Sequence, residues 1–166
     1  KAAEKRGMKV VAALAGRKMD VYDNKLPGAY GSYYSDRIWA KLDEIASEGE
    51  LDYLNLRAIL RDKSDERDDL YYNSDHHWTT HGAYIAYCEI MKELGEEPYA
   101  KEDFNIEVVT EEFFGTTWSA AGVKWAEGDK IEFWRYDDDM NYTMKILDKA
   151  GTFEGVEGFS YVEEDG

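Results

Sequence analysis

The chain gathers its most reactive side chains in one short stretch. Its three histidines are His76, His77 and His81, and Asp75 directly precedes the first of them. Histidine is the side chain whose ordinary pKa lies closest to neutral pH, so it is the usual general base of enzymes. A neighbouring carboxylate can orient the imidazole and stabilise its protonated form. The stretch is therefore a candidate for proton-transfer chemistry.

Three arrangements of these side chains fit their spacing. In an extended segment, side chains two apart point to the same side, so Asp75 and His77 would share a face while His76 points away. An early helix start would instead place His77 and His81 on one face, where they could bind a metal together with Asp75. The third interpretation is structural, with partly exposed imidazoles at a capped helix start. The spacing leaves all three open.

The elements around this stretch are those of an α/β protein. Met8 to Ala15 is a short apolar run, typical of a buried parallel strand. Ser35 to Gly49 has apolar residues at helical spacing, and Leu51 to Leu56 alternates apolar and polar residues. A strand, a helix and a second strand predict a βαβ unit with a right-handed crossover.

The histidines lie between a strand-like run and a helix. Leu70 to Tyr72 precedes them, and a helix capped by Thr79 or Thr80 follows and ends at Gly95. Reactive groups of α/β proteins commonly emerge at such a junction, at the carboxyl end of the sheet. Arg17 follows the first predicted strand and could face a substrate there, although an isolated basic residue in an acidic chain more often makes a surface ion pair.

The pattern changes after residue 100. Asn105 to Val109 and Lys130 to Tyr136 predict strands, Glu111 to Phe114 a helical turn, and residues 116–122 a loop of small residues. Ser119 in that loop is the internal serine to consider as a nucleophile. It lacks the strand–turn–helix setting that exposes a nucleophilic serine in hydrolases, which argues against this role.

These elements predict one domain with a core and an extension. Residues 1–99 form the α/β core, with a mostly parallel central sheet, and residues 100–150 add a small β-rich extension that ends in a strand at Tyr142 to Leu147. Residues 151–166 are rich in glycine and acidic residues and predict a flexible tail. Asp137 to Asp139 lacks the spacing of a calcium loop and predicts a solvated turn.

Composition limits the partners of the chain. Acidic residues outnumber basic ones by 16, 36 against 20. With no basic patch, nucleic acid is excluded as a partner, and anionic membranes and polyanions are disfavoured at long range. Thirteen tyrosines and five tryptophans suit a carbohydrate site, although they can equally serve the core and surface. A neutral or cationic glycan would not be repelled in this way, and the charge can also serve solubility alone.

Residues 75–84, Asp-His-His-Trp-Thr-Thr-His-Gly-Ala-Tyr, resemble the signature of the bacterial DHHW proteins. They are also similar to the Asp-x-His-Trp-Thr-x-x-Gly-Ala block of the alginate O-acetylation proteins, and both groups resemble SGNH-type hydrolases and acyltransferases. The resemblance covers most of residues 8–147 and is strongest over residues 70–95. It implies a partial SGNH or flavodoxin-like layered α/β fold.

The same resemblance implies roles for individual residues. In the alginate relatives the Asp and His of the motif form a triad with a serine, so Asp75 would be the orienter and His77 the base. Trp78, Tyr72 and Arg17 are the predicted substrate contacts. The serine of those relatives lies well downstream, and no matching Asp-Ser turn occurs in the 166 residues. The chain is therefore expected to stop before its nucleophile.

The leading hypothesis is a carbohydrate esterase or O-acyltransferase acting on an exported or cell-surface glycan, without cofactor or metal. Because such relatives are typically exported or membrane-anchored, a segment preceding Lys1 is expected to carry a leader or anchor. One alternative is a non-catalytic glycan-binding or assembly module with the same fold. The other is the metal site at Asp75, His77 and His81.

Overall fold

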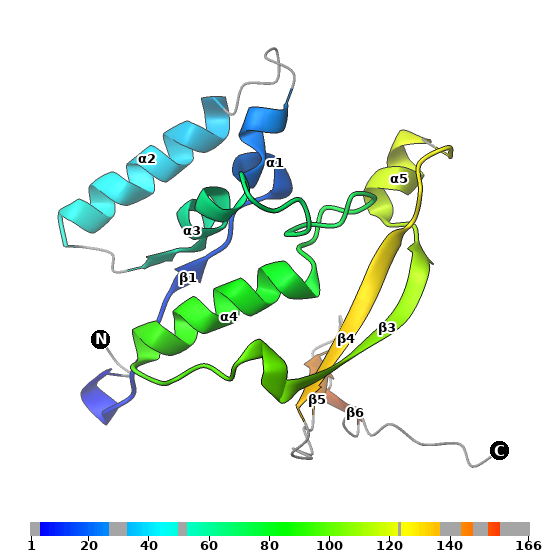
Figure 1. Ribbon diagram of the computed structural model, residues 1–166. Helices are drawn as coiled ribbons and strands as arrows, with labels where there is room; N and C mark the ends of the chain where they lie inside the picture. The colour runs from blue at the N-terminus through cyan, green and yellow to red at the C-terminus, as the bar shows by residue number, and fades with distance from the viewer. Residues whose placement is uncertain are drawn as a thin grey trace.

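The chain folds into a mixed α/β structure (Figure 1). The computed structural model describes residues 4–26, 33–49, 53–122, 124–136, 144–147 and 153–156. In chain order its elements are η1 (Glu4–Arg6), β1 (Ala13–Leu14), α1 (Lys18–Val21), η2 (Asp23–Lys25), α2 (Tyr33–Ser47), β2 (Leu54–Asn55), α3 (Leu56–Lys63), α4 (Thr80–Leu94), η3 (Lys101–Asp103), β3 (Phe104–Phe113), α5 (Thr116–Ala121), β4 (Asp129–Tyr136), β5 (Met144–Leu147) and β6 (Phe153–Val156).

A short parallel pair of strands forms the centre of the first hundred residues. β1 and β2 pair in parallel, with Ala13 opposite Leu54, and α1 and α2 lie between them in the chain. The predicted strand, helix and strand are therefore present. Each strand spans only two residues, and Met8 and Val10 of the apolar run stay 54% and 61% exposed. The parallel sheet is thus smaller than predicted, because the described residues give β1 no second neighbour.

The core lies between α1, α3 and the segment that leads into α4. The hydroxyl of Tyr22 accepts a hydrogen bond from the Leu70 amide (3.0 Å) and donates to the Arg67 carbonyl (3.1 Å). A buried hydroxyl needs such partners, and here they fasten the backbone before α4 to the core. The buried cluster consists of Val21, Tyr22, Leu60, Leu70 and Tyr71, with Trp78 and Ile85 packed against it.

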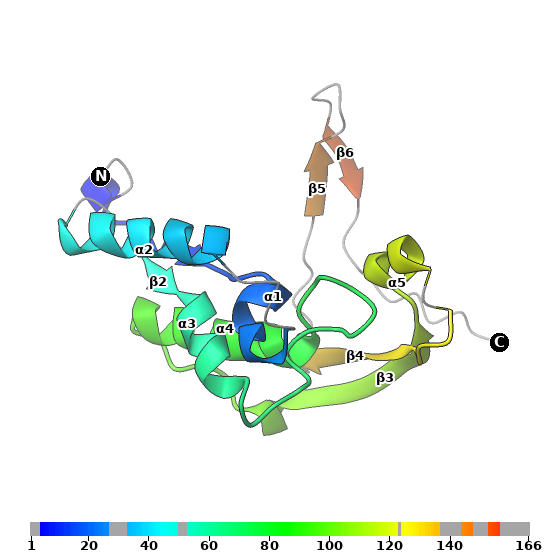
Figure 2. The same cartoon turned by 90° about the horizontal axis from the view of Figure 1, so that it is seen from above.

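The strand-like run before α4 closes a loop and, within the part of the chain that the structure describes, joins no sheet. Tyr71 makes an isolated antiparallel bridge with Trp78, and the Tyr72 amide donates to the His77 carbonyl (3.1 Å). The run was predicted to be a sheet strand, but its backbone pairs with the returning chain while its side chains fill the core. Residues 72–77 form the loop closed by this bridge, which reaches toward α5 (Figure 1, Figure 2).

The helix after the loop begins and ends where predicted. Thr79 is the N-cap of α4, and its side chain accepts a hydrogen bond from the Gly82 amide (3.2 Å). Gly95 ends the helix with a φ of 77°, a left-handed conformation that glycine adopts without steric cost.

The extension is an antiparallel hairpin of β3 and β4, with α5 at its turn end (Figure 1). Two predictions are wrong here. Residues 111–113 continue β3 and form no helical turn, because Phe113 pairs with Asp129 of β4. Residues 116–121 form α5 and not a loop. The first turn of α5 is held by a residue 41 positions earlier in the chain, which no local pattern can reveal.

The last described strands pair with each other. β5 pairs antiparallel with β6, from Met144–Val156 to Leu147–Phe153. The strand predicted up to Leu147 is therefore present over residues 144–147, while residues 153–156 of the predicted tail form a strand. Asp137 to Asp139 and the rest of that tail lie outside the described residues. Over the described part of the chain, no helix is long and apolar enough to cross a bilayer.

Replacing Gly82 with alanine should destabilise the fold, although alanine favours helices. A Cβ at this position would lie 2.3 Å from the Leu70 carbonyl oxygen and 3.2 Å from Cβ of Trp78. Because the obstacle is backbone, we expect a loss of roughly 1–3 kcal/mol in the free energy of unfolding. Urea denaturation measures this loss, and a variant as stable as the wild type would contradict the close packing of α4 on Leu70.

Candidate active site

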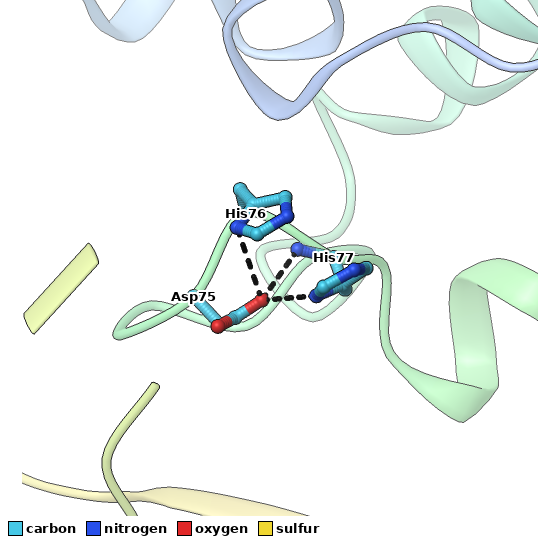
Figure 3. A group of neighbouring side chains, drawn as sticks. All are labelled: Asp75, His76 and His77. Carbon is cyan, nitrogen blue, oxygen red and sulfur yellow. Dashed lines mark hydrogen bonds and ion pairs between the residues drawn. The ribbon is translucent and has the colours of Figure 1, made fainter. Parts of the chain in front are cut away.

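The Asp75 carboxylate is the centre of the site (Figure 3). Its side chain is buried, and its Oδ1 atom lies 2.5 Å from Nδ1 of His77. The backbone N–H of His77 donates to the same oxygen at 2.9 Å. Aspartate readily accepts a hydrogen bond from the amide two residues on, and this local turn brings the ring of that residue back to the carboxylate. Asp75 and His77, two positions apart, therefore come into contact through a turn and not through an extended segment.

The proton positions follow from this contact. A carboxylate without a proton only accepts hydrogen bonds, so Nδ1 of His77 carries a hydrogen, and in the neutral ring the lone pair is on Nε2. Nε2 lies on the side of the ring away from Asp75 (Figure 3), and the His77 side chain is 67% exposed. A general base requires an imidazole that is fixed through one nitrogen and has its other, basic nitrogen accessible.

The second oxygen of Asp75 is held by the start of α5. The backbone N–H and the hydroxyl of Thr116 donate to Oδ2 at 2.8 and 2.9 Å. Burial raises the pKa of Asp75, but the hydrogen bonds from Thr116 and His77 outweigh it, so the pKa lies well below its usual range. The residue before Thr116 must be glycine, because a Cβ on Gly115 would lie 2.4 Å from Oδ2.

His76 also joins this group, contrary to the expectation that it points away. Its Nδ1 lies 2.8 Å from the Thr116 hydroxyl and 3.5 Å from Oδ1 of Asp75. Because that hydroxyl donates to Asp75, it accepts from His76, which places a hydrogen on Nδ1 of His76. The rings of His76 and His77 lie 3.9 Å apart, centroid to centroid. The turn at Asp75 folds both rings over the carboxylate.

The structure does not bring together the three residues of the alternative metal site, Asp75, His77 and His81. His81 lies in the first turn of α4, where its Nδ1 is 3.0 Å from the Asp69 carboxylate and its ring stands edge-on to Trp134. The helix begins after Thr79, so His77 and His81 never share a helical face. His81 instead belongs to a polar cluster against β4, where burial lowers its pKa.

Asp75, His76 and His77 bring three potential metal-ligand atoms within 4.8 Å of one another. Both oxygens of Asp75 already accept two hydrogen bonds each, and Nδ1 of each imidazole carries a hydrogen. A metal bound through Asp75 and the two Nδ1 atoms would have to displace those bonds and hydrogens. The donor set therefore fits proton transfer better than metal binding.

A cavity of about 750 Å³ lies beside His76. Arg17 lines it, as expected for a residue after the first strand, and also pairs with Asp20 at 3.0 Å. The other lining residues are Lys18, Met19, Tyr22, Lys25, Leu26, Asp68, Asn73 and Thr117.

The two predicted aromatic contacts lie apart from this cavity. Trp78 packs against the core, and Tyr72 lies edge-on to Phe113 with ring centroids 5.4 Å apart. Tyr72 lines a smaller pocket of about 150 Å³ that it shares with His81. The structure therefore brings Arg17 to the cavity that His76 lines, but not Trp78 or Tyr72.

Sequence reasoning missed Thr116, Gly115 and His76. The pattern of residues 116–122 predicted only a loop of small residues. The role of Gly115 and Thr116 depends on a contact across 41 positions of the chain, for which a single sequence carries no sign. Ser119, the candidate internal nucleophile, donates its hydroxyl to the Gly115 carbonyl (3.1 Å) within α5.

The stability of the fold should depend on the charge of Asp75. Because folding lowers the pKa of this group, its contribution is complete above about pH 5 and declines as pH falls below about 4. Replacing Asp75 with asparagine should cost roughly 1–3 kcal/mol of unfolding free energy at pH 7, and the gap between the two proteins should shrink in acid. Denaturant titrations from pH 3 to 7 measure it, and a gap that widens in acid would contradict the assignment.

Known proteins resemble this chain in sequence family and in fold. A family model described as SGNH hydrolase-like domain, acetyltransferase AlgX, matches residues 1–135. No curated protein matches by sequence. Among solved structures, the chain is similar to Bacillus cereus PatB1 with a sulfonyl adduct, with a TM-score of 0.67 and 18% identity over 93% of this chain and 52% of that one. It is also similar to the O-acetyltransferase domain of Pseudomonas putida AlgJ, with a TM-score of 0.58 and 17% identity over 81% and 52%.

The chain thus spans about half the length of each of these two structures. At such low identity their likeness shows the fold, which agrees with the predicted layered α/β class. The family match extends over residues 1–135 and includes the whole Asp75 loop. It confirms the resemblance to the alginate O-acetylation proteins. The chain belongs to the family of SGNH hydrolase-like domains of the acetyltransferase AlgX.

Proposed function

We propose that this domain takes part in acyl transfer on an exported polysaccharide, with His77 as general base and Asp75 as its orienter. The observation that carries the proposal is the 2.5 Å contact between Nδ1 of His77 and the buried Asp75 carboxylate, with Nε2 of the exposed ring left available. Membership of an acetyltransferase family supports the reaction class.

In the proposed reaction, Nε2 of His77 takes the proton of a serine hydroxyl as the serine oxygen attacks an ester carbonyl. The alcohol leaves with that proton, and an acyl-enzyme remains. A sugar hydroxyl or water then attacks the acyl carbonyl and gives its proton to Nε2 of His77, and the bond to the serine oxygen breaks as that oxygen takes the proton back. We propose that the serine lies outside these 166 residues, which fits a chain that spans about half of each similar structure.

The proposed substrate is a carbohydrate outside the cytoplasm. The AlgJ structure is that of an O-acetyltransferase domain, which supports transfer of an acetyl group to an oxygen atom, such as that of a sugar hydroxyl in this proposal. The excess of 16 acidic residues favours a neutral or cationic glycan over a polyanion at long range. In this proposal Arg17 contacts the substrate in the cavity beside His76, while Trp78 and Tyr72 fix the loop backbone from the core and from β3.

Turnover of an acetylated substrate by the full-length protein tests this proposal. Replacing His77 with alanine should lower kcat by roughly four to six decades, and replacing Asp75 with asparagine by about four. His81→Ala is the matched control, because His81 pairs with Asp69 away from the site and should leave turnover unchanged. Equal turnover by all the variants and the wild type would refute the role of the pair.

A second candidate is a non-catalytic glycan-binding module. It is favoured by an aromatic groove of about 360 Å³ between α4, β3 and β4. Aromatic rings stack on sugar rings, and Tyr99 at the rim is 47% exposed. The groove is lined by Thr80, Ala83, Tyr84, Tyr87, Tyr99, Phe104 and Trp134.

Binding and turnover distinguish the two candidates. In a binding module, a neutral oligosaccharide such as chitohexaose should bind without turnover, and Tyr99→Ala should weaken the binding at least about fivefold while His77→Ala leaves it unchanged. Isothermal calorimetry with the 166-residue chain measures this. Binding that is lost with His77→Ala but kept with Tyr99→Ala would instead place the ligand at the Asp75 loop.

A further inference from the structure

Two side chains of opposite charge hold the backbone that leads into Asp75. The ammonium group of Lys18, in α1, donates to the carbonyl oxygens of Tyr72 (2.8 Å) and Asn73 (3.1 Å). The carboxylate of Asp129, the first residue of β4, accepts from the amides of Asn73 (2.7 Å) and Ser74 (2.6 Å). The cation therefore binds carbonyls of the loop and the anion binds its amides.

The charged groups of Lys18 and Asp129 are both partly removed from water, and this desolvation costs free energy. Asp129 is 7% exposed, and burial lowers the pKa of Lys18, against the attraction of Asp129 and Asp75. Among the described residues, neither Lys18 nor Asp129 forms an ion pair, and their hydrogen bonds go to residues 72–74. A buried charge is retained where its hydrogen bonds repay its desolvation, and here the bonds fix one segment of backbone.

Ser74 extends this support to the other side of Asp75. Its hydroxyl lies 2.5 Å from the Asp129 carboxylate, to which it donates, and it accepts from the amide of Gly115 (3.0 Å). Its carbonyl accepts from the amide of Trp118 in α5 (2.9 Å). The residue before Asp75 is thus bonded both to β4 and to the turn that presents Thr116.

We propose that Lys18 and Asp129 are positioning residues that set the geometry of the Asp75–His77 pair. They hold residues 72–74 from the α/β core and from the hairpin, so that the next carboxylate meets the amides of His77 and Thr116. Asp75 and His77 therefore take up this geometry only when both the α/β core and the hairpin contact the loop. The catalytic use of this geometry rests on the proposed function, whereas the geometry itself can be measured without turnover.

Amide hydrogen exchange in the 166-residue chain tests the inference. The amides of His77 and Thr116 both donate to Asp75, so their protection reports the carboxylate's position directly. In Lys18→Met and in Asp129→Asn, exchange at these two amides should become about tenfold faster or more, because each substitution removes hydrogen bonds to a charged group. Exchange at Ala86, inside α4, should stay at the wild-type rate.

Lys25→Met is the matched control. Lys25 lines the same cavity as Lys18 but pairs with Asp68 and makes no bond to the loop, so exchange at His77 and Thr116 should be unchanged. Wild-type exchange at both amides in Lys18→Met and Asp129→Asn would overturn the inference. Equal acceleration at Ala86 would overturn it too, since the two charges would then only stabilise the fold.

A substitute variant and a turnover assay complete the test. If Asp129→Asn does not fold, Ser74→Ala takes its place beside Lys18→Met. It removes one bond to Asp129 and also the bond from the Gly115 amide next to Thr116, so the exchange expected to become faster is then read at His77. Turnover by the full-length protein separates this inference from the proposed function. Faster exchange in the variants of a protein that shows no turnover would leave the positioning role intact and refute the reaction.

Discussion

A buried carboxylate with all of its hydrogen-bonding capacity used is the constraint on which the rest of this structure depends. An isolated carboxylate cannot be removed from water without a large cost, so Asp75 is tolerable only with donors at both oxygens. Two donors come from His77, two residues later in the loop, and two from Thr116, 41 positions later. The fold must therefore bring the loop and the start of α5 together, and Gly115 leaves the room for it.

The other elements hold the Asp75 loop and the start of α5 in contact. The bridge between Tyr71 and Trp78 closes the loop, and the core beneath it holds both residues. Gly82 lets α4 approach the Leu70 carbonyl, so the helix that follows the loop packs directly on the strand-like run before it. The hairpin contributes the amides of α5 at its turn. Loop geometry is thus coupled to core packing on one side and to β3–β4 pairing on the other.

The chemistry follows from the same arrangement. Because the carboxylate is held by His77 and Thr116 and stays ionised, it fixes the His77 tautomer and leaves Nε2 as the basic atom. His76, which the motif places next to it, bonds to the Thr116 hydroxyl and stacks beside His77, so it contributes to orientation more readily than to proton transfer. The cavity beside His76 is also lined by Lys18 and Met19 of α1.

The sequence by itself determined what local interactions decide. The Asp75–His77 contact needs only a turn of three residues, and the start and end of α4 need only Thr79 and Gly95, so these were predictable. The family motif lies in the same stretch. Only the tertiary structure decided the place of His81, of Thr116 and α5, and of Lys18 and Asp129 around the loop. Each depends on contacts between segments that lie tens of residues apart in the chain. Core packing and hairpin pairing bring these segments together, and such contacts produce no periodic pattern in the sequence.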